Sequence, residues 1–207
     1  MGKFKSLDLL RNEFSLNNNH LANINKLIDG LIEWNQKVNL VGKSTLIDPI
    51  RSHILDSIQI SNFINYKNSK IIDIGTGAGF PGLVLASYSF SNVCLVDSNI
   101  KKIRFLEYIK KELGLSVQII YSKIENIHEK KFDYIVSRAL ASLNKLFFYS
   151  FKISHKKTKM IFLKGQKIQT EITEAKKFWN FNFIIKNSIS DKRGKVILIK
   201  NLKKINV

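Results

Sequence analysis

The stretch of residues 71–82 is unusually rich in glycine, and glycine at this spacing is typical of loops that bind nucleotides. It reads IIDIGTGAGFPG, so an apolar segment runs into the glycines and a helical stretch follows. Such glycines permit a tight turn and let the backbone approach a ligand where a Cβ atom would clash. Gly75, Gly77 and Gly79 fit the GxGxG pattern of S-adenosylmethionine sites. The register that ends at Gly82 instead fits the GxGxxG pattern of dinucleotide sites, and a plain strand-to-helix turn is the structural alternative.

Two acidic residues favour the S-adenosylmethionine register. Asp73 lies just before the glycines, where its carboxylate can organise the loop and attract the ammonium group of the ligand. The same carboxylate would repel the pyrophosphate of a dinucleotide. Asp97 ends the second apolar segment, where it can accept hydrogen bonds from both ribose hydroxyls, although dinucleotide sites use the same device. The alternative role of Asp97 is that of an N-cap for the helix that begins near Ile100.

Further candidates follow two later apolar segments. Ile124 and Glu125 come after the third segment, where Ile124 can pack on an adenine ring and the adjoining backbone can contact the edge of that ring. Arg138 follows the fourth segment, at the sheet edge where ligands bind in open parallel sheets. For both Glu125 and Arg138, an ordinary surface position is the alternative.

The residues that the chain lacks exclude some of the atoms that could be methylated. Pro49 and Pro81 are the only prolines, so the Asp/Asn-Pro-Pro-aromatic turn common in enzymes that methylate amino groups of adenine or cytosine cannot be present. Methylation of a pyrimidine at carbon 5 needs a cysteine nucleophile, and Cys94 belongs to an interior segment. The remaining targets are atoms with a free lone pair, such as guanine N7, or hydroxyl and amide groups that need a base. We assign no catalytic residue.

The elements that position these residues begin near residue 70. The expected strands are 71–74, 93–96, 117–121, 134–136 and 160–163, followed by 181–185 and 196–199. Helical stretches separate the first five strands, for example residues 100–113 with Gly114 as the C-cap, which predicts a parallel sheet with helices on both faces. Only a polar loop separates the last two strands, which predicts a hairpin. We therefore expect an α/β fold, a doubly wound seven-stranded Rossmann-like methyltransferase sheet with a C-terminal antiparallel hairpin.

An N-terminal helical region is expected before the sheet. Apolar residues recur at three- and four-residue spacing between Leu21 and Ile32, and Asp48-Pro49 is typical of an N-cap followed by a first-turn proline. We therefore predict two parts: residues 1–66 as the helical region and residues 67–207 as an S-adenosylmethionine-dependent methyltransferase domain.

The formal net charge of +18 favours a polyanionic partner, nucleic acid before membrane. Lysine enrichment by an AT-rich genome is the competing explanation. No apolar run approaches the roughly 20 residues of a membrane span, and the first residues lack the pattern of a signal peptide. One cysteine and four histidines indicate no metal site. We expect a soluble cytoplasmic protein, a monomer without an obligate protein partner.

Taken together, these motifs resemble a family of bacterial methyltransferases that modify guanine N7 in 16S ribosomal RNA, also called glucose-inhibited division protein B. The resemblance covers nearly the whole chain and includes several motifs in the right order. It rests on Trp34-Asn35 with Asn39-Leu40, His53-Ile54-Leu55-Asp56-Ser57, residues 73–82, Val136-Ser137-Arg138-Ala139, Leu163-Lys164-Gly165-Gln166, and Arg193 with residues 196–199.

The resemblance implies methyl transfer from S-adenosylmethionine to N7 of a single guanine in 16S ribosomal RNA, with the RNA or the small ribosomal subunit as partner. With Gly77 of the loop and Asp97 of the second segment added from the sequence pattern, the expected cofactor contacts are Gly75, Gly77, Phe80, Asp97, Ile124, Glu125 and Arg138. Lys164, Arg193 and segment 34–40 lie where the resemblance implies RNA contact. Ser52 departs from the family pattern at a basic RNA contact, and Ala78 replaces a frequent proline.

Two other functions remain open on the sequence. A nicotinamide-dependent oxidoreductase would use the GxGxxG register, and binding of NADH rather than S-adenosylmethionine would identify it. A non-catalytic RNA-binding protein would use the basic surface alone, but such a protein has no need of a loop with four glycines.

Overall fold

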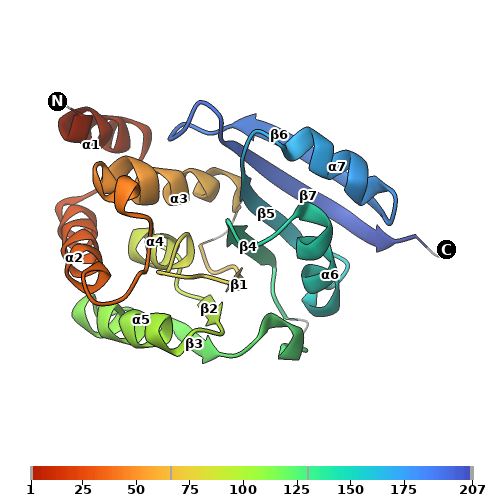
Figure 1. The fold of residues 1–207 in the computed structure, drawn as a ribbon, viewed down its shortest axis with the longest axis horizontal. Helices are drawn as coiled ribbons and strands as arrows, with labels where there is room; N and C mark the ends of the chain where they lie inside the picture. The colour runs from red at the N-terminus through yellow and green to blue at the C-terminus, as the bar shows by residue number, and fades with distance from the viewer. Residues whose placement is uncertain (1, 66, 130, 206–207) are drawn as a thin grey trace.

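A computed structural model describes residues 2–65, 67–129 and 131–205 of the chain. Its centre is a seven-stranded sheet in the order β3-β2-β1-β4-β5-β7-β6 (Figure 1). The strands are β1 (Ile71–Ile74), β2 (Val93–Asp97), β3 (Gln118–Tyr121), β4 (Tyr134–Arg138), β5 (Lys159–Lys164), β6 (Trp179–Asn187) and β7 (Lys195–Lys204). Strands β1 to β5 are parallel, and β7 runs antiparallel to both β5 and β6. The predicted fold class, with its C-terminal hairpin, is confirmed.

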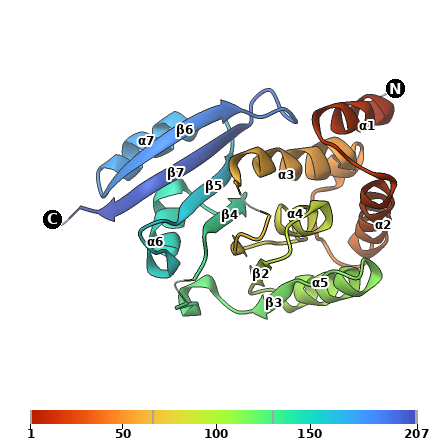
Figure 2. The same ribbon diagram turned by 180° about the vertical axis from the view of Figure 1, so that it is seen from behind.

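Helices cover both faces of the sheet, because the inner strands are apolar on both sides. One face carries α4 (Gly82–Tyr88) and α5 (Ile100–Glu112), and the other carries α6 (Leu143–Ile153) and α7 (Ile168–Lys176), as Figures 1 and 2 show from opposite sides. The chain steps outward from β1 through β2 to β3 and then returns to place β4 on the other side of β1. The carboxyl ends of β1 and β4 therefore form the topological switch point, where open α/β sheets bind ligands.

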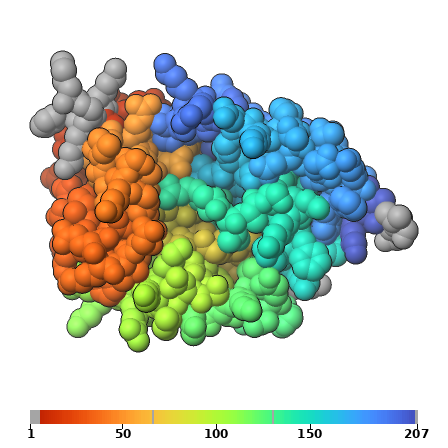
Figure 3. Space-filling view, viewed as in Figure 1, coloured from red at the N-terminus to blue at the C-terminus, as the bar shows by residue number. Residues whose placement is uncertain are grey.

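The N-terminal segments pack on the same face as α4 and α5. They comprise α1 (Gly2–Glu13), α2 (Asn18–Asn35), the 3-10 turns η1 (Lys43–Leu46) and η3 (Gln59–Phe63), and between them η2 (Ile50–Leu55) and α3 (Asp56–Ile58). Leu31 and Ile54 are fully buried in one core with Leu83 of α4 and Phe105 of α5. In the space-filling view the orange N-terminal residues lie against the teal segment after β4, with yellow residues visible only deep between them (Figure 3). Within the described ranges, no helix combines the length and apolar character that crossing a membrane requires.

The helix predicted after Asp48 forms, but its hydrogen bonding is irregular. Asp48 Oδ1 accepts a hydrogen bond from the backbone N–H of Arg51 at 3.0 Å, which confirms the predicted cap. Residues 50–55 then form a π-helical segment, and residues 59–63 form a 3-10 turn. The backbone carbonyl of Ser52, inside the π-helical segment, accepts a hydrogen bond from Arg138 at the end of β4. Such π-helical distortions are frequent at functional sites.

The loop between β6 and β7 lies against the same N-terminal segment. Arg51 Nε donates to the backbone carbonyl of Ser190 at 2.6 Å, and Gln59 Nε2 donates to Ser188 Oγ at 3.0 Å. Both contacts join residues far apart in the sequence. They bring loop 188–194, which contains Arg193, to the carboxyl side of the sheet.

Candidate active site

The glycine loop joins β1 to α4 and is anchored by Asp73 of β1. Asp73 Oδ2 accepts hydrogen bonds from Thr76 Oγ1 at 2.6 Å and from the backbone N–H of Gly82 at 2.8 Å. These bonds hold both ends of the loop, as the sequence predicts. The side chain is fully buried, and burial raises the pKa of Asp73 from 3.8 to about 7. Its other oxygen, Oδ1, has no hydrogen-bond partner among the described residues.

Gly77 is the loop residue whose backbone is open to a ligand. Its φ angle of +62° lies in the region that residues with a side chain rarely adopt. Among the described residues, a Cβ atom placed there would meet only Lys102 Nζ, at 3.7 Å. The space beside Gly77 is therefore free for a ligand, and a side chain at this position would fill that space.

Asp97 connects the end of β2 to the glycine loop. Its Oδ2 accepts a hydrogen bond from the backbone N–H of Gly77 at 2.9 Å, and its Oδ1 accepts one from the backbone N–H of Asn99 at 2.8 Å. The N-cap of α5 is Asn99, whose side chain accepts from the backbone N–H of Lys101 at 2.9 Å. The alternative role of Asp97 as that cap is therefore wrong. Each carboxylate oxygen of Asp97 can still accept a second hydrogen bond, which suits a ribose hydroxyl.

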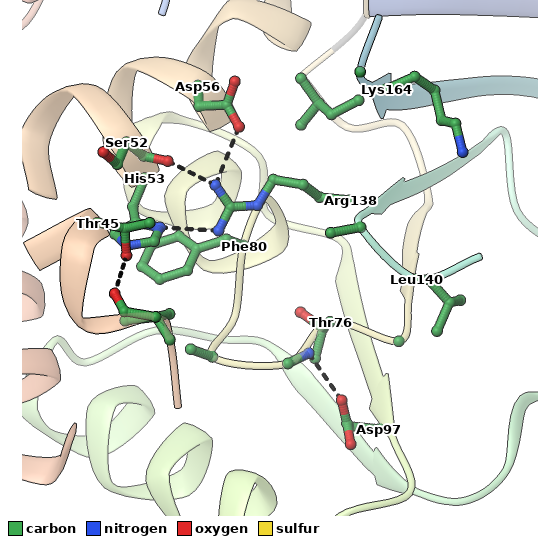
Figure 4. Close-up of a pocket in the computed structure, with 18 of the residues that line it drawn as sticks. Thr45, Ser52, His53, Asp56, Thr76, Phe80, Asp97, Arg138, Leu140 and Lys164 are labelled. Atoms are coloured by element: carbon green, nitrogen blue, oxygen red, sulfur yellow. Dashed lines mark hydrogen bonds and ion pairs between the residues drawn. The ribbon is translucent and has the colours of Figure 1, made fainter. Parts of the chain in front are cut away.

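Arg138 is held by contacts on both ends of its guanidinium group. Its Nη1 donates to the carbonyl oxygen of Ser52 at 2.8 Å and to Asp56 Oδ2 at 3.1 Å, and its Nη2 bonds His53 Nδ1 at 2.9 Å (Figure 4). The guanidinium carbon lies 5.1 Å from the centre of the Phe80 ring, a cation–π distance. The side chain is 17% exposed. Arg138 is thus no ordinary surface arginine, and its alternative role on the sequence is wrong.

His53 links Arg138 to the N-terminal segment. Its Nε2 lies 2.9 Å from Thr45 Oγ1, and Thr45 Oγ1 in turn donates to the carbonyl oxygen of Gly42 at 2.7 Å. The imidazole ring stacks on the Phe80 ring, with centroids 4.7 Å apart and planes 19° apart. Burial, together with the neighbouring Arg138 charge, lowers the pKa of His53 from 6.5 to about 3. The imidazole is therefore neutral at physiological pH.

One cleft of about 1640 Å³ collects the candidate cofactor residues at the switch point. All seven line it: Gly75, Gly77, Phe80, Asp97, Ile124, Glu125 and Arg138. Lys164, Gln166 and Arg193 line it as well. Pockets for small ligands usually measure about 300–1,000 Å³, so this cleft has room for a cofactor and part of a larger acceptor. Asp73 lies beneath the loop and is not among the lining residues. A direct contact between its carboxylate and the ammonium group of the ligand therefore has no support in the structure.

The residues for which the resemblance implies RNA contact differ in their surroundings. Lys164 is only 10% exposed, and its Nζ lies 2.7 Å from Glu171 and donates to the carbonyl oxygen of Ala141. Arg193 is 76% exposed, in the loop between β6 and β7. Trp34 packs its ring against Phe105 and Tyr108 of α5, a structural contact.

Sequence reasoning did not find the partners of Arg138. Ser52, His53 and Asp56 lie on the N-terminal segment. On the sequence, His53 and Asp56 belong only to a motif without an assigned role, and Ser52 is only a departure from the family pattern. The available signal was the pair His53 and Asp56 on a helical face that is otherwise apolar. Their meeting with Arg138 depends on tertiary packing across more than 80 residues of chain, which a local pattern does not encode.

The described residues also bear on two other kinds of chemistry, attack by a cysteine nucleophile and metal binding. Cys94 is buried in β2, and burial raises the pKa of its thiol from 9.0 to about 12. It is therefore unsuited to act as the nucleophile that carbon-5 methylation requires. Among the residues that the structure describes, no group of three or more histidine, cysteine or acidic side chains is placed to hold a metal ion.

Comparison with known proteins shows the family of the chain and supports its fold. The sequence profile of the family "rRNA small subunit methyltransferase G" matches residues 20–201. The ribosomal RNA small subunit methyltransferase G of Rickettsia prowazekii (strain Madrid E) is 40% identical over 173 residues, 84% of this chain and 90% of the relative. Among solved structures, the ribosomal protein L11 methylase of Lactobacillus delbrueckii subsp. bulgaricus has a TM-score of 0.59 at 17% identity, covering 71% of this chain and 76% of that one. A SAM-dependent methyltransferase of Aquifex aeolicus also scores 0.59, at 16% identity, covering 75% of this chain and 95% of that one.

The sheet order with its reversed β7 and the glycine loop at the switch point, together with the family match, define the class of protein: an S-adenosylmethionine-dependent methyltransferase. The match over residues 20–201 and the identity to the Rickettsia protein make the assignment more specific. The chain belongs to the rRNA small subunit methyltransferase G family.

Proposed function

We propose that this enzyme transfers a methyl group from S-adenosylmethionine to N7 of a single guanine in 16S ribosomal RNA. The observation that carries the proposal is the cleft that joins the open backbone of Gly77 and the side chain of Arg138 to the exposed, basic Arg193 loop. A cofactor fits the first part, and a nucleic acid fits the second.

Different residues of the cleft bind different parts of the cofactor. The Gly75–Gly77 backbone allows close approach, Asp97 accepts hydrogen bonds from ribose hydroxyls, and Ile124 with Glu125 borders the adenine. Arg138 has five N–H donors, of which three are used by Ser52, Asp56 and His53. The Nε–H and one Nη2–H remain and suit the cofactor's carboxylate. S-adenosylmethionine supplies a methyl group on a positively charged sulfur, which an acceptor nitrogen attacks.

Guanine N7 suits this site because the nitrogen carries no proton and its lone pair needs no general base. The side chains that could act as a base near Arg138 are already engaged. His53 is buried with both ring nitrogens bonded, and Asp56 receives Arg138 on one oxygen and Ser190 Oγ on the other, at 2.6 Å. Rate enhancement then comes from alignment of the nitrogen, the methyl carbon and the sulfur, which contributes about 7–11 kcal/mol in favourable cases.

The basic surface supports an RNA substrate. The net charge of +18 attracts phosphate groups, and Lys192, Arg193 and Lys195 are among the residues that line the cleft. The proposal includes the finer features expected from the sequence. The enzyme acts in the cytoplasm as a monomer on 16S RNA or the small subunit, and residues 1–66 form a helical part beside a methyltransferase domain of residues 67–207.

A transfer assay tests the proposal. Purified enzyme is incubated with methyl-labelled S-adenosylmethionine and, separately, with undermethylated small subunits, naked 16S RNA and large subunits. We expect label in 16S RNA from at least one of the first two substrates and none in the large subunit. Tight binding of NADH with no binding of S-adenosylmethionine would instead support the oxidoreductase alternative.

A further inference from the structure

We infer that His53 is a positioning residue for methyl transfer: its Nδ1 accepts a hydrogen bond from Arg138 and so fixes the guanidinium edge that faces the cofactor. The inference rests on the proposed cofactor contact of Arg138. It gives a role to a buried histidine that no step of the methyl transfer uses.

The donors and acceptors around His53 can be arranged in one order only, from Arg138 to Gly42. Arg138 has donors and no acceptor, so its Nη2 donates and His53 Nδ1 must be the unprotonated nitrogen. The ring proton is then on Nε2, which donates to Thr45 Oγ1. Thr45 in turn donates its own hydroxyl proton to the carbonyl oxygen of Gly42. The chain of donors from Arg138 to Gly42 is complete, and every member is satisfied.

The charge state of His53 agrees with this order. A protonated imidazole would present a donor and a positive charge to the guanidinium, so it could not accept from Arg138. The groups that face the ring are Arg138, the Thr45 hydroxyl and the Phe80 ring, and none of them is an acid that would favour protonation. The residue is 3% exposed, and its pKa of about 3 keeps the ring neutral.

His53 constrains the guanidinium in a way that Asp56 and Ser52 do not. Those two bind Nη1, at one corner of the guanidinium plane, and hold neither N–H of Nη2. His53 binds Nη2, and the Phe80 ring contacts both the imidazole and the guanidinium. A second corner and a flat ring together fix the plane. The free Nε–H and Nη2–H are thus held in one direction, and such preorganisation favours binding and alignment of the cofactor.

A pair of substitutions separates the acceptor from the rest of the side chain. In His53→Asn the amide oxygen can occupy the place of Nδ1 and accept from Arg138. In His53→Gln the amide reaches the place of Nε2, keeps the contact with Thr45 and loses the acceptor. Because a hydrogen bond to a charged group contributes about 1.5–3 kcal/mol, we expect His53→Gln to weaken S-adenosylmethionine affinity by roughly 10- to 100-fold, and His53→Asn to recover most of that loss. His128→Gln, on the exposed segment after the 3-10 turn η4 (Ile124–Asn126), is the matched control.

Calorimetric titration gives the affinity for S-adenosylmethionine, and thermal melting gives the stability of each variant. The same titrations in an Arg138→Met background complete a double-mutant cycle. We expect His53→Gln to have no further effect on affinity once Arg138 is replaced. Equal losses in the Asn and Gln variants overturn the inference, and so does a loss from His53→Gln that is just as large in the Arg138→Met background. Unchanged affinity in Arg138→Met alone overturns both the inference and the proposed contact of Arg138, while labelling of 16S RNA by the wild type would still stand.

A measurement on the unaltered protein covers the case in which the variants do not fold. Nitrogen-15 imidazole shifts report which ring nitrogen carries the proton. We expect the His53 ring as the neutral tautomer with the proton on Nε2 between about pH 5 and pH 8, a range well above its pKa of about 3. A proton on Nδ1, or a protonated ring in that range, overturns the inference.

Discussion

The Asp97 carboxylate accepts a hydrogen bond from the backbone N–H of Gly77 at 2.9 Å, which ties the end of β2 to the loop that follows β1. The two residues thus act as one unit: Gly77 offers the space for a ligand, and Asp97 fixes the backbone that borders it. A ligand that bonds Asp97 must therefore also lie beside Gly77. Cofactor binding should accordingly respond to changes at either residue.

Replacement of Asp97 is expected to affect binding more than the fold. Asp97→Ala removes the acceptor for Gly77 and the proposed acceptor for the ribose, so S-adenosylmethionine affinity should fall by at least about 10-fold, because hydrogen bonds to charged groups contribute about 1.5–3 kcal/mol each. Asp97→Asn keeps one acceptor and should lose less. Calorimetric titration of both variants checks the order. Equal affinity in the wild type and Asp97→Ala would remove Asp97 from the site.

Gly77→Val should abolish cofactor binding because a branched side chain would fill the open space beside the loop. A positive φ is itself strained for valine, so the control must share that strain. Gly114 has a φ of +60°, has no described residue within 4 Å of a Cβ atom built on it, and is not among the cleft residues. Gly114→Val should lose stability to a similar degree and still bind S-adenosylmethionine. Loss of binding in both variants would show that backbone strain, and not the filled space, is responsible.

Asp73 should make the stability of the folded protein measurably dependent on pH. Its pKa is raised from 3.8 to about 7, so between these values the folded state holds a proton that the unfolded state releases. This contribution favours the folded state at low pH, and it is lost as pH rises through the window from about 4 to 7. Asp73→Asn, which cannot ionise, should show less loss of melting temperature over that window than the wild type. Parallel melting curves for the two proteins would contradict a shifted Asp73.

The salt dependence of RNA binding tests whether the basic charge acts at the cleft. If Arg193 contacts a phosphate of single-stranded RNA, Arg193→Gln should reduce the slope of log affinity against log salt by about 0.7. Lys111→Gln makes the same change of charge at the exposed end of α5, outside the cleft, and should leave the slope nearly unchanged. Filter binding at several salt concentrations measures both. Equal slopes for the two variants would favour the competing explanation, in which codon bias has spread the lysines over the surface.

The sheet could be predicted from the sequence because its signals are local. Each buried strand is a short apolar run, and Gly114 and the polar loop before β7 mark where elements end. The cleft residues could be predicted for a related reason: in parallel strands, the residues that follow each strand meet at one edge. The glycines and Asp97 therefore converge without any knowledge of side-chain packing.

The surroundings of Arg138 could not be predicted in the same way. His53 and Asp56 reach it through a π-helical segment that periodicity represents as an ordinary helix. Thr45 belongs to a short 3-10 turn with no apolar pattern of its own. The ion pair of Lys164 with Glu171, at 2.7 Å, could not be predicted either, because a lysine at the end of a strand carries no local signal for its partner.

The central claim is methylation at N7, and mapping of the modified atom tests it most directly. RNA labelled by the enzyme is treated with borohydride and then aniline, which cleaves the chain at N7-methylguanine and leaves other methylated bases intact. We predict a single cleavage in 16S RNA, at the guanine that carries the label, and none when S-adenosylmethionine is omitted. Label incorporated without any cleavage would contradict the claim, since the methyl group would then be on another atom.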